Sequence, residues 1–279
     1  MEPKKITVPD VGRMKAAGER ITMVTAYDCA FARLLDEAGV DLLLVGDSLG
    51  MVVQGLPTTL PVTLDEIVYH TRMVVRGRQR ALVVGDLPFG SYQASPTQAL
   101  ESAIRLVKDG GAEAVKLEGG IHMARTIEAI AAVDVPVMGH VGLTPQSVHR
   151  MGGHRVQGRR SGKSVGERER VLDDARAVQA AGAFAVVLEC IPLDLAAEIT
   201  AELTIPTIGI GAGAHCDGQV LVLHDLIGLS CDWTPRFAKR YAEVGRDVVR
   251  AATSFVGEVK AGAFPTEAQA FKPAKAVAG

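Results

Sequence analysis

Short β-branched segments alternate with longer segments of helical periodicity along almost the whole chain, and this alternation is the strongest constraint on the fold. It is the sequence pattern of repeated βα units with a parallel sheet. The segments expected to be strands are continuously apolar, as strands covered on both faces should be. Roughly eight are present, which is the strand number of a (β/α)8 barrel. They span residues 21–27, 41–46, 81–85, 114–117, 136–139, 183–188, 207–210 and 220–224.

Start signals for helices lie between these segments. Thr63 and Glu66 form a capping-box pattern, and apolar residues at helical spacing follow it. Ser95 followed by Pro96 supplies a second helix start, an N-cap with proline at the first helical position. The regular succession of such units favours one domain over several.

We therefore expect an α/β fold with a single (β/α)8 TIM barrel domain over residues 1–262. A helix over Val8–Ala17 is expected to cap the bottom of the barrel. The helical pattern of residues 235–262 predicts extra C-terminal helices, and the Ala-, Pro- and Lys-rich residues 263–279 are expected to form a flexible tail. Residues 142–166 are too long for an ordinary loop, and we interpret them as a mobile lid or binding loop.

Charge and composition exclude several classes of function. The 279 residues carry 30 basic and 32 acidic side chains, and only 4% are aromatic. This leaves neither a basic surface nor a base-stacking platform, so we expect no nucleic-acid partner. No apolar stretch approaches the roughly 18 residues that a membrane helix needs, so we expect no membrane span. The first ten residues lack the apolar core of a secretory signal, and we expect a cytoplasmic protein.

Acidic side chains follow several of the expected strands at their carboxyl ends, where the active site of a parallel barrel lies. The central three are Asp47, Asp86 and Glu118. Acids are costly to bury unless they are paired or bind a metal, so their convergence on one barrel mouth predicts a divalent cation. Ligands that are all oxygen favour Mg²⁺ or Mn²⁺ over zinc. For each acid taken alone, the alternative is that it caps the following helix.

Three further residues at strand ends are suited to chemistry. Lys116 stands two positions before Glu118, so both side chains point to the same face, and a lysine inside a barrel needs an anion or a catalytic task. The alternatives for Lys116 are a salt bridge to a neighbouring acid and a Schiff base. Glu189 has apolar neighbours and is the candidate general base, with a helix-capping or packing role as the alternative. His140 is either a substrate hydrogen-bond donor or a core histidine with its own partners.

Longer motifs occur in order between about residue 20 and beyond residue 240. They are Thr25-Ala-Tyr-Asp28, Val45-Gly-Asp-Ser-Leu-Gly-Met51, Thr59-Leu-Pro-Val-Thr63, Asp86-Leu-Pro-Phe89, Val115-Lys-Leu-Glu-Gly-Gly120, Gly139-His-Val-Gly-Leu-Thr-Pro-Gln-Ser147, Gly152-Gly-His-Arg-Val-Gln-Gly158, Leu188-Glu-Cys-Ile-Pro192, Ile208-Gly-Ile-Gly-Ala-Gly213 and Asp217-Gly-Gln219. In these motifs the chain resembles the ketopantoate hydroxymethyltransferases. So many distinct motifs in one order make the resemblance specific.

The resemblance implies a barrel of the phosphoenolpyruvate/pyruvate-binding superfamily and a Mg²⁺-dependent enzyme of pantothenate biosynthesis, with one Mg²⁺ per subunit and commonly a homodecamer of two pentameric rings. The implied reaction transfers a hydroxymethyl group from 5,10-methylenetetrahydrofolate to 3-methyl-2-oxobutanoate and gives 2-dehydropantoate. Matched motif by motif, it implies metal positions at Asp47, Asp86 and Glu118, keto-acid contacts at Asp47, Ser48, Asp86 and Lys116, and a proton acceptor at Glu189.

Two rival hypotheses accompany this one. A lyase or mutase of the same superfamily would also enolise a 2-oxo acid, but such enzymes usually carry a cysteine on a lid loop, and residues 142–166 contain none. The second rival hypothesis is a non-catalytic barrel that serves in assembly. The presence of every predicted acid and of Lys116 disfavours it. His154 stands where the family pattern has a tyrosine, so that position is given no role in folate binding or in the lid.

Overall fold

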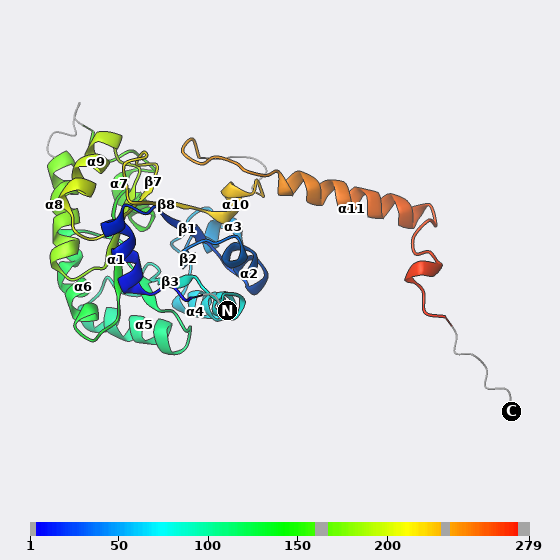
Figure 1. The fold of residues 1–279 in the computed structure, drawn as a ribbon, viewed down its shortest axis with the longest axis horizontal. Coiled ribbons are helices and arrows are strands. Elements are labelled where there is room, and N and C mark those ends of the chain that lie inside the picture. The colour runs from blue at the N-terminus through cyan, green and yellow to red at the C-terminus, as the bar shows by residue number, and fades with distance from the viewer. Residues whose placement is uncertain (1–3, 160–166, 230–234, 273–279) are drawn as a thin grey trace. The chain divides into compact units, whose positions relative to one another are not determined.

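Eight parallel strands close into a barrel in the computed structural model of the chain, which describes residues 4–159, 167–229 and 235–272 (Figure 1). The strands pair in sequence order, and β8 closes the barrel by pairing with β1. The expected (β/α)8 class is thereby confirmed. The strands are β1 (Ile21–Thr25), β2 (Leu42–Val45), β3 (Leu82–Asp86), β4 (Ala114–Lys116), β5 (Val137–Gly142), β6 (Ala185–Glu189), β7 (Thr207–Ile210) and β8 (Gly218–Leu221).

Helices separate successive strands from β1 to β7 and cover the barrel from outside, whereas β8 follows β7 without a helix between them. Both predicted start signals are confirmed. Thr63 donates its backbone N–H to Glu66 Oε2 (2.7 Å) and accepts from the Glu66 backbone N–H (3.3 Å), and Ser95 Oγ accepts from Gln98 N (3.1 Å). The helices are α1 (Val8–Ala17), α2 (Cys29–Glu37), α3 (Leu49–Val52), α4 (Leu64–Gly77), α5 (Pro96–Lys108), α6 (Ala124–Ala131), α7 (Val148–Met151), α8 (Glu167–Ala180), α9 (Leu193–Glu202), α10 (Leu223–Leu226) and α11 (Val244–Lys260), with 3-10 turns η1 (Ile121–Met123), η2 (Pro145–Ser147) and η3 (Glu267–Gln269).

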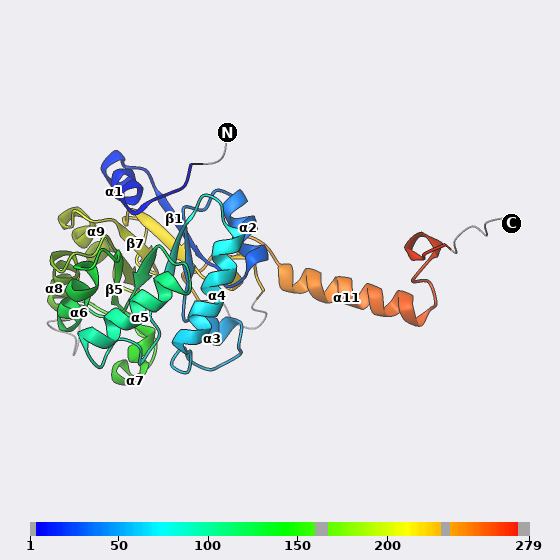
Figure 2. The same ribbon diagram turned by 90° about the horizontal axis from the view of Figure 1, so that it is seen from below.

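The barrel interior is an apolar core that is closed at one end by α1. Figure 2 shows α1 at one end of the barrel and α3 and α7 at the other. Val11 of α1 is fully buried and belongs to the same cluster as Ile21 and Met23 of β1. The predicted N-terminal capping helix is therefore present. With one end filled by apolar side chains, polar chemistry is confined to the other end, where the strands finish.

The eighth strand lies earlier than predicted. Residues 220–224 were expected, whereas β8 covers Gly218–Leu221 and Leu223 already begins α10. Gly218 pairs with Ile21, and a Cβ atom at Gly218 would stand 2.5 Å from the Ile21 carbonyl oxygen, so only glycine fits this close approach. The strand therefore starts at a residue that in isolation resembles a turn signal.

Contacts divide the chain into two units, Met1–Leu223 and His224–Gly279. The first unit contains the whole barrel. In the second, α11 is exposed over most of its length and carries Val248, Val249 and Phe255 on its surface. The predicted boundary between a domain of residues 1–262 and a tail of 263–279 stays a prediction. Over the described residues, no helix combines the length and the apolar character that crossing a membrane requires.

Candidate active site

The predicted site residues come from five successive strands and gather at the carboxyl ends of those strands, since adjacent parallel strands finish at the same rim of the barrel. Most of them are buried in the first unit. Asp47 and Ser48 follow β2, Asp86 ends β3, Lys116 ends β4 and Glu118 follows it, His140 lies in β5, and Glu189 ends β6.

Lys116 forms a buried ion pair with Asp86. Its Nζ atom donates to both carboxylate oxygens, at 2.8 and 2.9 Å, and the two side chains are only 5% and 2% exposed. Burial alone would lower the pKa of Lys116, but the carboxylates of Asp86 and Glu118 outweigh it and raise the pKa above its ordinary value. A permanently charged ammonium is a poor Schiff-base nucleophile, so the ion-pair reading of Lys116 is the one that the geometry supports.

Asp47 lies directly beside this ion pair. Its backbone N–H points to Asp86 Oδ2 at 3.3 Å. Burial first, and then the charge of Asp86, raise the pKa of Asp47 to about 7. Burial and the neighbouring charge of Asp47 also raise the pKa of Glu118 well above its usual range. The cluster thus holds three carboxyl groups against one ammonium.

Gln146 connects two of these carboxyl groups and was not predicted from the sequence. Its Nε2 atom donates to Asp47 Oδ2 (2.9 Å) and to Leu87 O (3.0 Å), and its backbone N–H donates to Glu118 Oε2 (3.0 Å). Tyr92 in turn donates its hydroxyl to Gln146 Oε1 (2.7 Å). The only sequence signal was a glutamine inside the motif Gly139-His-Val-Gly-Leu-Thr-Pro-Gln-Ser147, at a position that turns out to be buried.

His140 lies between Glu118 and Glu189. Its Nδ1 atom is 3.6 Å from Glu118 Oε1, and its Nε2 atom is 3.1 Å from Glu189 Oε2. In the part of the chain that the structure describes, neither ring nitrogen has a partner in ordinary hydrogen-bond geometry. Burial, and then the charge of Lys116, lower the pKa of His140, so the imidazole is neutral at pH 7. A neutral ring between two carboxylates can donate to only one of them.

Ser48 stands at the edge of the cluster. Ser48 is the N-cap residue of α3, and its Oγ atom is 2.8 Å from the Tyr27 hydroxyl. Asp28, the acid that follows β1, has a different role. Asp28 caps α2, because its side chain accepts from Phe31 N at 2.9 Å, so the capping alternative is correct for this acid.

The donor set fits a divalent cation of the magnesium type. Two or three buried carboxylates with one counter-charge leave negative charge that a cation would neutralise, and burial followed by the charge of Asp86 raises the Asp47 pKa. The described residues hold no group of three or more His, Cys, Asp or Glu side chains already set around one point. Mg²⁺ binds through one or two carboxylates while substrate and water fill its other positions, so the pair Asp47 and Asp86 suffices.

Fold and site together define an enzyme of the (β/α)8 barrel class with an acidic, lysine-containing centre at its strand ends. The model of the ketopantoate hydroxymethyltransferase family matches residues 5–267. The chain belongs to this family.

Individual relatives agree over nearly the full length. The 3-methyl-2-oxobutanoate hydroxymethyltransferase of Geobacter metallireducens is 58% identical over 268 residues, covering 96% of this chain and 99% of its own. That of Anaeromyxobacter dehalogenans is 59% identical over 272 residues, covering 96% of this chain and 88% of its own. A solved phosphonopyruvate hydrolase is 12% identical with a TM-score of 0.62, covering 97% and 93% of the two chains, and shares the fold alone.

Proposed function

We propose that this protein transfers a hydroxymethyl group from 5,10-methylenetetrahydrofolate to 3-methyl-2-oxobutanoate, giving 2-dehydropantoate for pantothenate biosynthesis. One water is consumed, and tetrahydrofolate leaves. The observation that carries the proposal is the buried cluster of Lys116, Asp86 and Asp47 beside Glu189, in a chain 58% identical to a relative of that name. The cluster offers the groups that enolising a 2-oxo acid requires, a base and fixed positive charge.

Asp47 and Asp86 would hold Mg²⁺, with Glu118 as a further metal position. When bound, the ion polarises the ketone of the substrate and makes the C3 hydrogen more acidic. Asp47 must ionise to take this role, which its raised pKa makes dependent on pH. Gln146 holds Asp47 and Glu118 in place from one side through its amide and its backbone N–H.

Lys116 and Ser48 would contact the keto acid. The Lys116 ammonium is fixed by Asp86 and remains charged, so it is placed to stabilise negative charge that develops on the substrate oxygen. The Ser48 hydroxyl lies within reach of the Tyr27 hydroxyl, which orients it. Both groups are held before substrate arrives, so little reorganisation is required.

Glu189 would accept the C3 proton. Its side chain is 15% exposed, enough to meet a ligand at the barrel mouth, and the neutral ring of His140 lies 3.1 Å from its Oε2 atom. Loss of the proton leaves an enolate, whose C3 carbon then bonds to the methylene carbon of the donor. The bonds from this carbon to N5 and N10 of the folate break, and water supplies the oxygen of the new hydroxymethyl group. His140 would position the base or the substrate by its Nε2–H.

The test separates enolisation from transfer. Wild-type protein is incubated with 3-methyl-2-oxobutanoate in D₂O, with and without Mg²⁺, and loss of the C3 proton is followed by NMR. Methylenetetrahydrofolate is then added, and 2-dehydropantoate is measured. Metal-dependent exchange followed by product is the expected result. Absence of exchange under every condition, folate included, would overturn the proposal and return the barrel to its lyase or non-catalytic alternatives.

The remaining expectations extend the proposal. We also propose that the protein acts in the cytoplasm and forms a homodecamer, the assembly that the family resemblance implies. The exposed apolar side chains of α11, among them Val249 and Phe255, support self-association. Light scattering of the purified protein would give the subunit number. The proposed lid of residues 142–166 falls partly outside the described residues, since 160–166 are not among them.

A further inference from the structure

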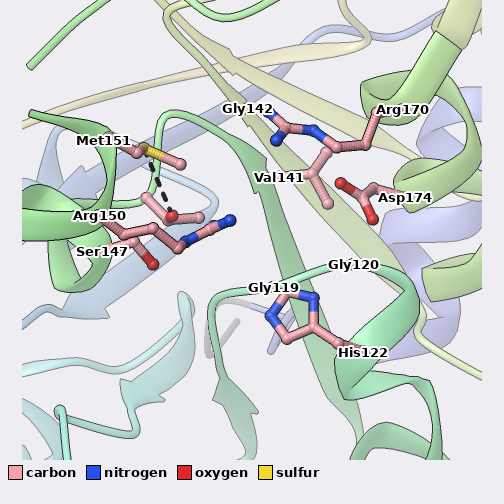
Figure 3. A pocket seen from close by; sticks show the side chains of 11 residues that line it. Gly119, Gly120, His122, Val141, Gly142, Ser147, Arg150, Met151, Arg170 and Asp174 are labelled. Carbon is pink, nitrogen blue, oxygen red and sulfur yellow. Dashed lines mark hydrogen bonds between the residues drawn. The ribbon is translucent and has the colours of Figure 1, made fainter. Parts of the chain in front are cut away.

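A basic hollow, open to solvent, lies beside the carboxyl ends of β4 and β5. Its walls come from η1, the loop after β5, α7 and α8. Figure 3 shows Arg150 and Arg170 extending into it from opposite sides, with His122 below them. Nothing in the proposed chemistry of the acidic cluster uses these three side chains.

The two guanidinium groups are available to bind an anion. Among the described residues neither is ion-paired, and the contact that Arg170 makes is a 3.3 Å hydrogen bond to Gln157 Oε1. Asp174 also lines the hollow, but its Oδ1 atom already accepts from Ile121 N at 2.9 Å. Two arginines against one acid leave net positive charge. Guanidinium groups match the two oxygens of a carboxylate.

The hollow adjoins the acidic cluster without being part of it. Gly119 and Ser147 line it, and each directly follows a cluster residue, Glu118 and Gln146. Consecutive Cα atoms are about 3.8 Å apart, so the two sites share a wall. A ligand that lies across Gly119 and Ser147 would place one end at the mouth of the cluster and a negatively charged end in the hollow.

We propose that this hollow binds the glutamyl carboxylates of methylenetetrahydrofolate. The inference rests on the proposed function and adds to it the place where the tail of the one-carbon donor is held. The pterin end, which carries the methylene group, faces the acidic cluster. The aminobenzoyl spacer lies along Gly119 and Ser147, which separate the two sites, and Arg150 and Arg170 bind the carboxylates.

The test compares two donors that differ only in the tail, 5,10-methylenetetrahydrofolate and 5,10-methylenetetrahydropteroate, which lacks the glutamate. Variants are Arg150→Gln, Arg170→Gln and the double substitution. Arg176→Gln is the matched control, because Arg176 lies on the same helix α8 but pairs with Asp173 and Glu202 outside the hollow. KM and kcat are measured for each donor with saturating keto acid and Mg²⁺.

Wild type and the control should have a lower KM for the folate than for the pteroate. Each single substitution should raise the folate KM by about 5- to 20-fold, the range for losing one charge-assisted hydrogen bond at an accessible site. The double variant should no longer distinguish the two donors. An unchanged folate KM in the double variant would overturn the inference, whereas a wild type inactive with both donors would overturn the proposed function instead.

A free anion such as inorganic phosphate is the alternative ligand that the two arginines would bind. Inorganic phosphate is therefore titrated into the wild type and the double variant. If phosphate alters the wild-type rate through these arginines while the two donors keep equal KM values, the hollow serves a free anion and the folate assignment is wrong. Competition between phosphate and the folate, absent with the pteroate, supports the assignment.

Discussion

The Gln146 side-chain amide donates a 2.9 Å hydrogen bond to Asp47 Oδ2, although 99 residues separate the two along the chain. The backbone N–H of the same glutamine binds Glu118, so one residue after β5 orients acids that follow β2 and β4. An amide is a suitable linker here because it donates without adding charge to a cluster already rich in carboxylates. Gln146 is therefore a positioning residue for the acids.

Gln146→Leu should lower the affinity for the keto acid in the presence of Mg²⁺ by about 10- to 100-fold, as is typical when a group that orients metal-binding side chains is lost. Isothermal titration with 3-methyl-2-oxobutanoate and Mg²⁺ measures it. Gln98→Leu is the control, since the Gln98 side chain bonds to Gly90 and Ala94 in the loop before α5. Equal affinities in the two variants would contradict the positioning role.

Lys116→Met should destabilise the protein by about 3–5 kcal/mol, because it leaves a buried carboxylate without its partner. Asp86 is 2% exposed and relies on Lys116 for two hydrogen bonds. The double variant Lys116→Met with Asp86→Asn should recover most of this loss while staying inactive. Urea unfolding monitored by circular dichroism gives the values. A double variant no more stable than the single would show that the ion pair is not the cause.

Glu189→Gln should still bind keto acid and Mg²⁺ but exchange the C3 proton about 10²- to 10⁴-fold more slowly, the usual contribution of a general base. The amide keeps the size of the side chain and its contact distance from His140 Nε2, 3.1 Å in the wild type. NMR-detected exchange in D₂O measures the rate, and titration checks binding. Exchange at the wild-type rate would assign the base elsewhere.

Asp47 should make the metal-free protein less stable as pH rises from about 4 to 7. The pKa of this carboxyl is about 7 in the folded chain against an ordinary 3.8, so within this window the folded state binds more protons than the unfolded state. The contribution is fully present below the unfolded pKa and is lost as pH rises through the folded one.

Urea midpoints between pH 4.5 and 7.5, measured in a chelator, test this pH dependence on wild type and Asp47→Asn. The wild type should lose stability relative to the variant as pH increases, and Mg²⁺ with keto acid should reduce that loss. A difference between the two proteins that does not change with pH would show that Asp47 is ionised throughout.

Much of the architecture follows from local signals. The caps at Thr63 and Ser95 lie where predicted, and Thr207–Ile210 is a strand with the predicted bounds. These features depend on neighbours within a few residues, which a sequence displays directly. β8 was misplaced because the glycine at its start is required by the Ile21 backbone, which lies far away in the sequence.

Most residues of the site could be predicted from the sequence, but the contacts between them could not. Their positions at strand ends place Asp47, Asp86 and Lys116 at one rim of the barrel. Strand periodicity, however, predicts only the face to which a side chain points and not the residue that it contacts. Whether Lys116 would pair with Asp86 or with Glu118 depended on the stagger of β3 against β4. Gln146 lies in a 3-10 turn without periodicity, so only its place inside a longer motif marked it.

The acidic cluster draws its members from neighbouring strands of a sheet that has no free edge. A slip of one residue in any strand would turn that strand's side chain to the opposite face. The chain therefore cannot align this cluster until β2, β3 and β4 pair in their native register, and during folding catalytic competence should arrive together with that register. Activity regained on refolding would then report the correct register of these strands and not the formation of the individual helices.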